Sequence, residues 1–367
     1  MRARLEDVCE RSSSNLRQAD VAGRSGDYPI YGASGYIGNV DFYHQELPYV
    51  AIVKDGAGIG RTVLLPAKSS VIGTMQYLLP KKNVLPEYLC YVVRYMHLEK
   101  YFSGATIPHI YFRDYKSEEF NLVPVDYQKE IVATLGKIEA IVAAHQQQLQ
   151  MLDELVKARF IELFGDMFLN SKAWKKQALD SLADVVSGIT KGRKTKEPQL
   201  IEVPYMAVSN VKDGYIDWTT VKTIQATQQE IEQYRLLPDD VLMTEGGDPD
   251  KLGRGAILKE PLQNCIHQNH IFRVRLNESL ILPAFFEEYL KHQKAKRYFL
   301  GCAKQTTGIA SINMRQLKAL PVLLPPLELQ EQFAAFVEQT DKSKVAVQKA
   351  LDEAQLLFDS LMQKYFG

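Results

Sequence analysis

The chain has little cysteine, no net charge and no long apolar run, and each absence excludes a class of protein. Only 4 of its 367 residues are cysteine, at positions 9, 90, 265 and 302, with no CxxC pair and no histidine at metal-ligand spacing. This excludes a disulfide scaffold and a zinc site, and predicts reduced, buried or half-buried thiols. No stretch approaches the ~20 apolar residues of a membrane span, and the N-terminus lacks the apolar core of a secretory signal. We therefore expect an intracellular, cytoplasmic protein that contacts no membrane.

The charge balance limits how the chain could bind nucleic acid. Its 44 basic and 44 acidic residues leave a formal net charge of zero, so the molecule is no polycation and only local basic clusters could contact phosphates. A hydrophobic content of 46% and a charged content of 24% are those of a soluble globular protein. The length is sufficient for two domains of ordinary size.

Motifs of catalysis and nucleotide binding are also missing. The stretch AIVKDGAGIGRTVLL (residues 51–65) has a cluster of glycines but matches neither GxxxxGK[ST] nor GxGxxG. The TVLLP that follows is β-like, whereas a phosphate loop leads into a helix. The chain contains no GxSxG, HExxH or Asn-Pro-Pro-Tyr motif and no glycine-rich loop suited to S-adenosylmethionine, and TEGGDPD is interpreted as a solvated loop. We expect a protein that is no enzyme by itself and binds no cofactor or metal, in which these glycines turn one strand back beside the next.

An internal repeat organises the sequence. ATIPHIYFRDYKSEEFNLVPVDYQKEI aligns without gaps with TGIASINMRQLKALPVLLPPLELQEQF, pairing Ile110 with Ile312, Arg113 with Arg315 and Gln128 with Gln330. Upstream, LPYVAIVKDG aligns with LPDDVLMTEG, GRTVLL with GRGAIL, VIGTMQYLL with IHQNHIFRV and LPEYL with LPAFF. The alignment predicts a duplicated unit of domain, helix, domain, helix. The first copy lacks the WKKQA that precedes SLADV in the second.

Both repeated tails have heptad stripes of apolar residues, which predict long helices that pack along their length. The stripe of the first tail consists of positions 131, 135, 138, 142, 145, 149, 152, 156, 159 and 163. The stripe of the second tail consists of positions 333, 337, 340, 344, 347, 351, 354, 358, 361 and 365. We expect the two helices to pack antiparallel. His145, Arg159, Thr340 and Lys344 interrupt the stripes, as register-setting polar positions or as contact points for a partner.

The regions before the tails are predicted to be mixed α/β (α+β) domains. Short β-like runs alternate with loops, and LPEYLCYVVRYMHLEKYF and LPAFFEEYLKHQKAKRYF read as amphipathic helices. The predicted organisation is a first domain over 1–124, a helix over 125–165, a second domain over 166–325 and a second helix over 326–367. Two similar domains separated by helical rods could read two patches on duplex DNA.

Side chains suited to DNA occur at matched positions of the two copies. Arg61 and Arg254 follow the glycine turns, and Arg113 and Arg315 follow the repeated I-x-x segment. KGRKTK (191–196) is a local basic cluster, and HQNH (267–270) offers side chains that can pair with adenine. Each residue taken singly is more typical of an ordinary surface position than of a DNA contact, so it is the duplicated placement of the arginines that favours DNA contact.

Taken together, these motifs resemble the specificity (S, HsdS-type) subunit of a type I restriction-modification system. The resemblance covers essentially the whole chain and rests on YPIYGASGYIG, VAIVKDGAGIGRT, LGRGAIL with HQNHIFRV, TTGIASINMRQLKALPVLLPPLELQ, and the tail VPVDYQKEIVATL with its ELFGD end. It implies that each domain recognises one half of a bipartite site in double-stranded DNA, while the helices set the spacer between the half-sites. It also implies that the helices dock two methyltransferase (M) subunits, joined by restriction (R) subunits, and that S-adenosylmethionine, ATP and magnesium belong to those partners. The short start before Leu5 predicts an opening strand that is incomplete or supplied from elsewhere.

The resemblance also implies two DNA-reading surfaces. Their expected residues are Lys54, Arg61, Gln76, His109, Tyr111 and Arg113 in the first domain, and Lys191, Arg193, Lys194, Lys196, Lys251, Arg254, His267, Gln268, Asn269, Lys304, Gln305, Thr306, Asn313 and Arg315 in the second. Two alternatives stay open: the recognition subunit of a type IIB-like modification complex, and a coiled-coil scaffold that binds only proteins.

Overall fold

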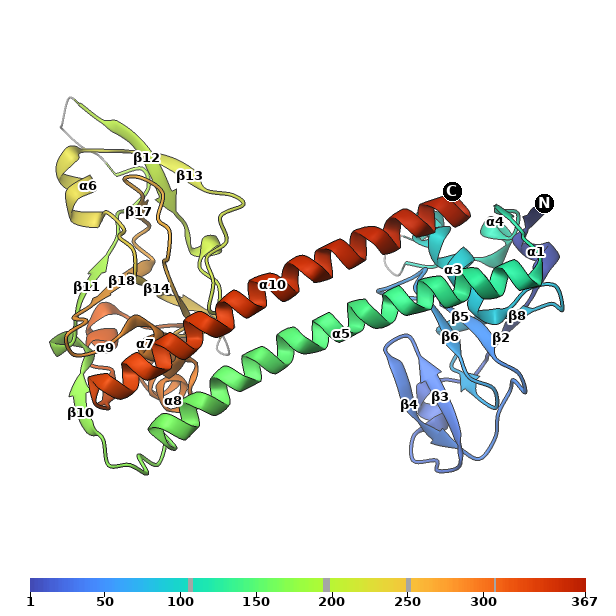
Figure 1. Ribbon diagram of the computed structural model, residues 1–367, viewed down its shortest axis with the longest axis horizontal. Helices are drawn as coiled ribbons and strands as arrows, with labels where there is room; N and C mark the ends of the chain where they lie inside the picture. Colours follow the sequence, from blue (N-terminus) through green and yellow to red (C-terminus); the bar gives the residue numbers. More distant parts are fainter. Residues whose placement is uncertain (105–107, 194–198, 249–251, 307) are drawn as a thin grey trace. The chain divides into compact units, whose positions relative to one another are not determined.

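The computed structural model describes residues 1–104, 108–193, 199–248, 252–306 and 308–367. The chain divides into two compact units: unit 1 contains Met1–Gln148 and Val347–Gly367, and unit 2 contains Leu149–Ala346. Two helices of 40 residues, α5 (Val125–Phe164) and α10 (Leu327–Phe366), each begin in one unit and end in the other (Figure 1). In the predicted organisation each helix was a separate segment, whereas in the structure each helix belongs partly to unit 1 and partly to unit 2.

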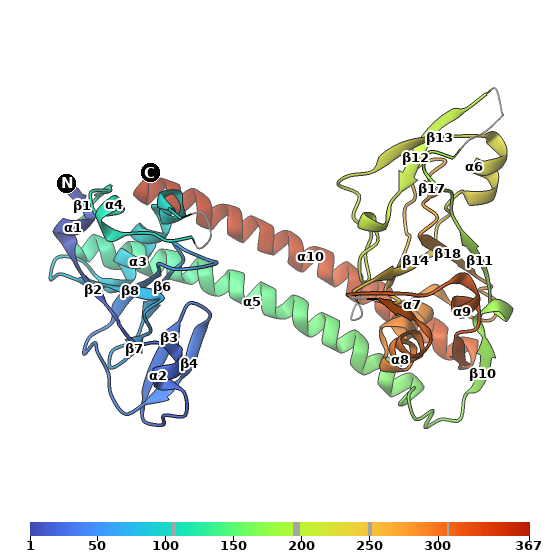
Figure 2. The same ribbon diagram turned by 180° about the vertical axis from the view of Figure 1, so that it is seen from behind.

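Unit 1 consists of mixed helices and strands before α5. Its elements are β1 (Arg2–Arg4), α1 (Leu5–Val8), β2 (Cys9–Ser13), α2 (Gln18–Val21), β3 (Tyr28–Gly32), β4 (Gly35–Val40), β5 (Tyr49–Val53), β6 (Thr62–Leu65), β7 (Ser70–Val71), β8 (Met75–Pro80), α3 (Pro86–Tyr95), η1 (Leu98–Tyr101), α4 (Phe112–Tyr115) and β9 (Glu119–Asn121). The strands form three sheets, with the orders β1-β9, β2-β8-β5-β6 and β4-β3-β7. The β4-β3-β7 sheet lies on the side of the four-stranded sheet away from α5 (Figure 2).

Unit 2 has counterparts of the strands of unit 1 in the same order, with additional strands and with short helices at different places. They are β10 (Lys175–Ala178), η2 (Leu179–Ser181), β11 (Ala183–Ser187), β12 (Ile201–Met206), η3 (Val208–Asn210), β13 (Lys222–Ala226), α6 (Gln228–Tyr234), β14 (Val241–Thr244), β15 (Gly246–Gly247), β16 (Gly255–Ile257), β17 (Ile266–His267), β18 (Ile271–Leu276), α7 (Pro283–Lys291), α8 (Gln293–Cys302), β19 (Lys304–Thr306), β20 (Ile309–Ser311), α9 (Met314–Lys318) and β21 (Pro321–Leu324).

The sheet topology repeats between the units, which confirms the duplication read from the sequence. In unit 2 the orders β10-β21, β11-β18-β14-β16 and β13-β12-β17 match the three sheets of unit 1 strand for strand. The match includes strand direction, because β3 pairs antiparallel with β4 and parallel with β7, just as β12 pairs with β13 and β17. An additional sheet, β15-β20-β19, is found in unit 2.

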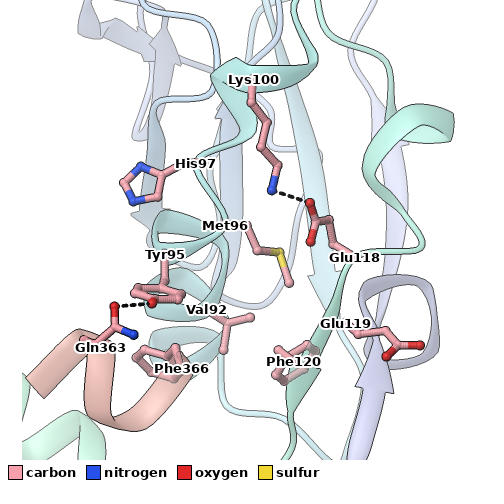
Figure 3. Close-up of a pocket in the computed structure, with 10 residues that line it drawn as sticks. All are labelled: Val92, Tyr95, Met96, His97, Lys100, Glu118, Glu119, Phe120, Gln363 and Phe366. Atoms are coloured by element: carbon pink, nitrogen blue, oxygen red, sulfur yellow. Dashed lines mark hydrogen bonds and ion pairs between the residues drawn. The ribbon is translucent and has the colours of Figure 1, made fainter.

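The opening strand of unit 1 corrects one expectation. Arg2–Arg4 form β1 and pair with β9, with Arg4 opposite Glu119, as the longer β10 pairs with β21. The first copy therefore has its opening strand from its own N-terminal residues. Both predicted amphipathic helices are divided in the structure. The first is divided into α3 and η1 at His97, which has a φ of 51° (Figure 3). The second is divided into α7 and α8 at His292, which adopts an extended conformation.

The two long helices complete the core of each unit. In unit 1, Ile131 and Leu135 of α5 belong to the same buried cluster as Met362 and Phe366 of α10. In unit 2, Phe160 near the end of α5 packs edge to face on Phe333 near the start of α10, with ring centroids 5.4 Å apart. The helices thus run antiparallel within each unit, as the heptad stripes predicted. Every stripe position is buried or half-buried.

The polar residues that interrupt the stripes have local partners. Lys344 forms an ion pair of 2.6 Å with Asp153, which joins α10 to α5. Thr340 donates a hydrogen bond to the Phe336 carbonyl, and Arg159 lies over the Phe336 ring. These contacts fit the interpretation of register-setting positions. All four cysteines are free, and burial raises the pKa of the Cys9 thiol to about 12, as expected for reduced thiols.

Candidate DNA interface

The glycine-rich stretch of unit 1 is a turn between two antiparallel strands. β5 and β6 pair with Ile52 opposite Thr62, and the residue after the turn continues into a strand rather than a helix. Gly56, Gly58 and Gly60 all have positive φ, and a Cβ on Gly60 would lie 2.6 Å from the backbone nitrogen of Glu99. The glycines therefore turn one strand back beside the next, and the turn leads into β6 rather than into the helix that a phosphate-binding loop requires.

A loop from later in the chain docks on this turn and brings predicted residues together. The amide of Ile110 donates to the carbonyl of Lys54 (3.0 Å), and the amide of Gly56 donates to Pro108 (2.9 Å). The His109 imidazole is paired with the Asp55 carboxylate. Asp55 also forms an ion pair with Lys54, with 2.9 Å between Oδ2 and Nζ. Lys54 and His109, far apart in sequence, thus lie on one surface.

Planar groups pack against one another at the end of the same loop. The rings of His109 and Tyr111 are 4.1 Å apart, and the Arg113 guanidinium lies 4.5 Å from the centre of the Tyr111 ring. Tyr111 is 42% exposed and the Arg113 side chain 74% exposed. An exposed arginine held by an aromatic ring is pre-organised for contact with a base edge or a phosphate.

Arg61 connects the turn to the β3–β4 ribbon. Its Nη2 donates a hydrogen bond to the Ala33 carbonyl in the ribbon turn. In the ribbon, Tyr36 is 63% exposed and Ile37 is 36% exposed, and the glycines of β3 and β4 add no side-chain bulk. β7 pairs with β3 at Ile30 and Tyr31, and an antiparallel pair of strands such as β3 and β4 can enter the major groove of DNA. Tyr36 was not among the predicted DNA contacts, although its place in YPIYGASGYIG between glycines was a usable signal.

Unit 2 has a matching arrangement after β14. The amide of Ile312 donates to the carbonyl of Glu245 (2.9 Å), and β15 pairs with β20. Glu245, which aligns with Asp55, also pairs with a histidine, here His270 from the loop between β17 and β18. In neither unit did the sequence lead us to predict that the acidic residue after the strand pairs with a histidine. The aligned acidic residues Asp55 and Glu245 were the available signal.

The remaining candidates of unit 2 are distributed as follows. Lys191, Lys304 and Arg315 are exposed, and Asn313 caps α9 by accepting a hydrogen bond from the amide of Gln316 (2.9 Å). Arg254 is half-buried, and its Nε has no hydrogen-bond partner among the described residues. Gln305 and Thr306 lie in β19. Lys194, Lys196 and Lys251 fall outside the described residues.

Three half-buried candidates are engaged within unit 2. Arg193 forms an ion pair with Glu230 and donates to the carbonyl of Gln225 (3.2 Å). Gln268 accepts a hydrogen bond from the amide of Val208 (3.3 Å), and Asn269 contacts the His270 ring. These contacts fix the three side chains beside β12, β13 and β18.

Two predicted DNA contacts are corrected by the structure. Gln76 is 2% exposed and donates to the buried Tyr115 hydroxyl, so it belongs to the core. His267 is fully buried, its Nδ1 lies 3.1 Å from the Ile271 carbonyl, and burial lowers its pKa to about 4. Gln76 lies in β8 and His267 in β17. Each side chain is on a strand face that other residues of its unit cover.

No helix among the described residues has the length and hydrophobicity needed to cross a membrane. Likewise, the described histidine, cysteine and acidic side chains form no group of three or more that could hold a metal ion.

Comparison with known proteins defines the class. The fold is a duplicated mixed α/β unit joined to two 40-residue helices. The family model for the type I restriction modification DNA specificity domain matches twice, over residues 1–154 and 171–354. The chain belongs to this family.

Individual relatives are distant. The chain is 27% identical over 194 residues to the putative type I restriction enzyme MjaX specificity subunit of Methanocaldococcus jannaschii, covering 53% of this chain and 45% of that protein. It is 24% identical over 284 residues to the EcoKI specificity subunit of Escherichia coli K12, covering 72% and 60% respectively. The chain therefore spans less than two thirds of either relative.

Solved structures share the fold over the whole chain. The S subunit of a type I restriction-modification system from M. genitalium superposes with a TM-score of 0.61 at 15% identity, covering all of this chain and 96% of that one. A chain from a structure describing complex assembly and conformational transition of the type I system has a TM-score of 0.52, also at 15% identity, with 100% and 97% covered.

Proposed function

We propose that this chain is the DNA-recognition subunit of a type I restriction-modification complex, in which each unit binds one half of a bipartite DNA site. The observation that carries the proposal is the duplicated docking of a loop on the strand turn. In unit 1 the docked loop brings the exposed Tyr111 and Arg113 near the half-buried Lys54, and in unit 2 the exposed basic residues Lys304 and Arg315 flank the docked strand. Because the loops differ in sequence, the two units would read different half-sites.

The helices supply the second part of the proposal. Large apolar side chains are exposed along both helices, at Ile141, Met151, Leu155 and Ile161 of α5 and at Val345, Leu356 and Leu357 of α10. These exposed apolar side chains are candidates for contact with other proteins. The helices would set the spacer between half-sites and dock two methyltransferase subunits, with restriction subunits joining the full complex.

The chemistry would reside in those partners. The subunit itself would be non-catalytic and bind no cofactor, while S-adenosylmethionine, ATP and magnesium would be bound by the methyltransferase and restriction subunits. The complex would act in the cytoplasm. A type IIB-like complex would use the same recognition subunit without a separate motor.

The test is DNA binding by the chain assembled with its methyltransferase. We expect sequence-specific binding of duplex DNA whose affinity falls steeply with salt, since phosphate contacts release counterions. Binding to the methyltransferase with no affinity for DNA at any salt concentration would contradict the proposal and favour the protein-binding scaffold.

A further inference from the structure

Both units carry the tripeptide Gly-Tyr-Ile between matching strands. In unit 1 it is Gly35-Tyr36-Ile37, at the start of β4, and in unit 2 it is Gly214-Tyr215-Ile216, between β12 and β13. The pair β12 and β13 is the counterpart of β3 and β4 in the sheet topology. Gly35 and Gly214 both have positive φ, at 114° and 78°. The tripeptide is therefore part of the duplicated unit, although the connection that contains it is longer in unit 2.

In each unit a hydrogen bond joins this turn to the Gly-Arg segment that was a candidate for DNA contact. The Arg61 guanidinium donates to the carbonyl of Ala33 in the turn between β3 and β4. The amide of Gly214 donates to the carbonyl of Gly255 (3.1 Å), and Gly255 directly follows Arg254, the counterpart of Arg61. The two tripeptides therefore lie beside the same part of the candidate DNA interface in each unit.

The tyrosines of the two tripeptides are exposed to nearly the same extent, 63% for Tyr36 and 60% for Tyr215. Residues that the two copies share for structural reasons are buried, as Gln128 and Gln330 are at the starts of the long helices. An exposed tyrosine ring adds little to a core. The same residue at two matched, exposed positions therefore indicates a ligand that both units contact.

This ligand is expected to be a feature that both half-sites share. The docked loops differ between the units, since His109 and Tyr111 of unit 1 align with Ser311 and Asn313 of unit 2. Side chains that read bases should differ in this way if the two half-sites differ in sequence. The sugar-phosphate backbone, in contrast, is the same in every half-site, and tyrosine side chains are among the groups that bind its phosphates.

The hydroxyl of Tyr36 is placed to make such a contact. It donates a hydrogen bond of 3.0 Å to Oδ1 of Asn39 at the surface of the ribbon. A phosphate oxygen can replace this neutral acceptor, because hydrogen bonds to charged acceptors are stronger.

We propose that Tyr36 and Tyr215 are matched phosphate-binding residues, each of which donates a hydrogen bond from its hydroxyl to a backbone phosphate of the half-site that its own unit binds. This inference rests on the proposed function, because it requires each unit to bind DNA. The two tyrosines fix how each unit lies on the duplex and carry no base preference. The loops that differ between the units supply that preference.

The test uses the full chain assembled with its methyltransferase, and duplexes that contain the motif found by methylome sequencing. Tyr36→Phe and Tyr215→Phe each remove one hydroxyl and keep the ring. Fluorescence anisotropy is expected to show roughly tenfold weaker binding for each variant and roughly hundredfold for the double variant, since each site loses a hydrogen bond to a charged group. Competitor duplexes with base changes in either half-site should be discriminated as they are by wild type.

Uncharged phosphate analogues locate each contact. Duplexes with a single methylphosphonate linkage are titrated with wild type and with each variant. At one phosphate of one half-site, the methylphosphonate is expected to weaken binding by wild type at least about fivefold and to have no further effect on Tyr36→Phe. Tyr215→Phe should show the same behaviour at a phosphate of the other half-site.

Tyr127→Phe, which removes an exposed hydroxyl from α5, is the matched control and is expected to leave the affinity for DNA unchanged. Unchanged affinity of either Tyr36→Phe or Tyr215→Phe, relaxed base discrimination, or the absence of a phosphate coupled to each tyrosine would overturn the proposal. If wild type still binds DNA sequence-specifically in that case, the proposed function stands. A lack of DNA binding by wild type would overturn both.

Discussion

The carboxylate of Asp55, at the end of β5, holds the imidazole of His109, which comes 54 residues later. Both side chains are about three-quarters buried, at 28% and 24% exposure, so the pair is partly shielded from solvent. Glu245 holds His270 in the same way in unit 2. The two units thus use the same acid position to fix a histidine beside the docked loop.

Removing one acid should affect one half-site only. Asp55→Asn loses the charge that holds His109, so the loop carrying Tyr111 and Arg113 is expected to be less ordered. We expect a loss of roughly fivefold to tenfold in affinity for DNA, on the order of 1 kcal/mol. The matched variant is Glu245→Gln. Competition with duplexes altered in either half-site should show relaxed specificity in a different half for each variant. Relaxation of the same half by both would contradict the assignment.

Two buried glutamines hold the helix starts in place. The Gln128 amide donates to Asn83 (3.0 Å) and Val123 (2.8 Å) and accepts from Leu85 (2.9 Å), and Gln330 makes the equivalent three bonds. Gln128→Leu leaves these backbone groups unsatisfied, at an expected cost of about 2–4 kcal/mol. Urea unfolding should measure the loss in the free energy of unfolding. Hydrogen exchange should show that the loss is in unit 1. The exposed Gln147→Leu should change stability by less than about 0.5 kcal/mol.

Unit 2 should lose stability in mild acid because of His267. Burial lowers the pKa of His267 to about 4, below the usual 6.5 of the unfolded chain. The native state therefore favours the neutral imidazole, so this contribution is complete above pH 6.5 and is lost as the pH falls toward 4. The lost stability is at most roughly 3 kcal/mol. Denaturant unfolding of wild type and His267→Asn between pH 7 and 4 should show a steeper decline for wild type, and identical slopes would refute this origin.

The sequence was sufficient for the repeat and the long helices, because both depend on regular spacing. The heptad stripes are visible in one dimension, and residues such as Ile131 and Phe333 are buried as their positions require. The strand turn could also be predicted, since glycines at positive φ leave a clear composition signal.

It was harder to predict which of the candidate DNA-contacting side chains lie on the surface. Gln76 and His267 are polar residues in β-like sequence, and alternation along a strand does not say which face a neighbouring element covers. Tyr115 closes over Gln76 from another part of the chain. The pairing of Asp55 with His109 depends on a loop docking from 54 residues away, which only the folded structure reveals.

The helices should act as a ruler for the unread spacer. Inserting seven residues into α5 and seven opposite them in α10 preserves the heptad stripe and adds about 10 Å of helix, close to three base pairs. We expect methylated sites with unchanged half-sites and a spacer longer by about three base pairs. Methylome sequencing reads both quantities, and an unchanged spacer would be inconsistent with the ruler.

Domain exchange tests the central claim most directly. Residues 166–322 would be replaced by the corresponding domain of another family member, and the chimera expressed with the methyltransferase for methylome sequencing. We predict a bipartite methylated motif in which one half-site changes and the other half-site and the spacer length stay the same. A change in both half-sites, or a single contiguous motif, would contradict recognition by two independent units.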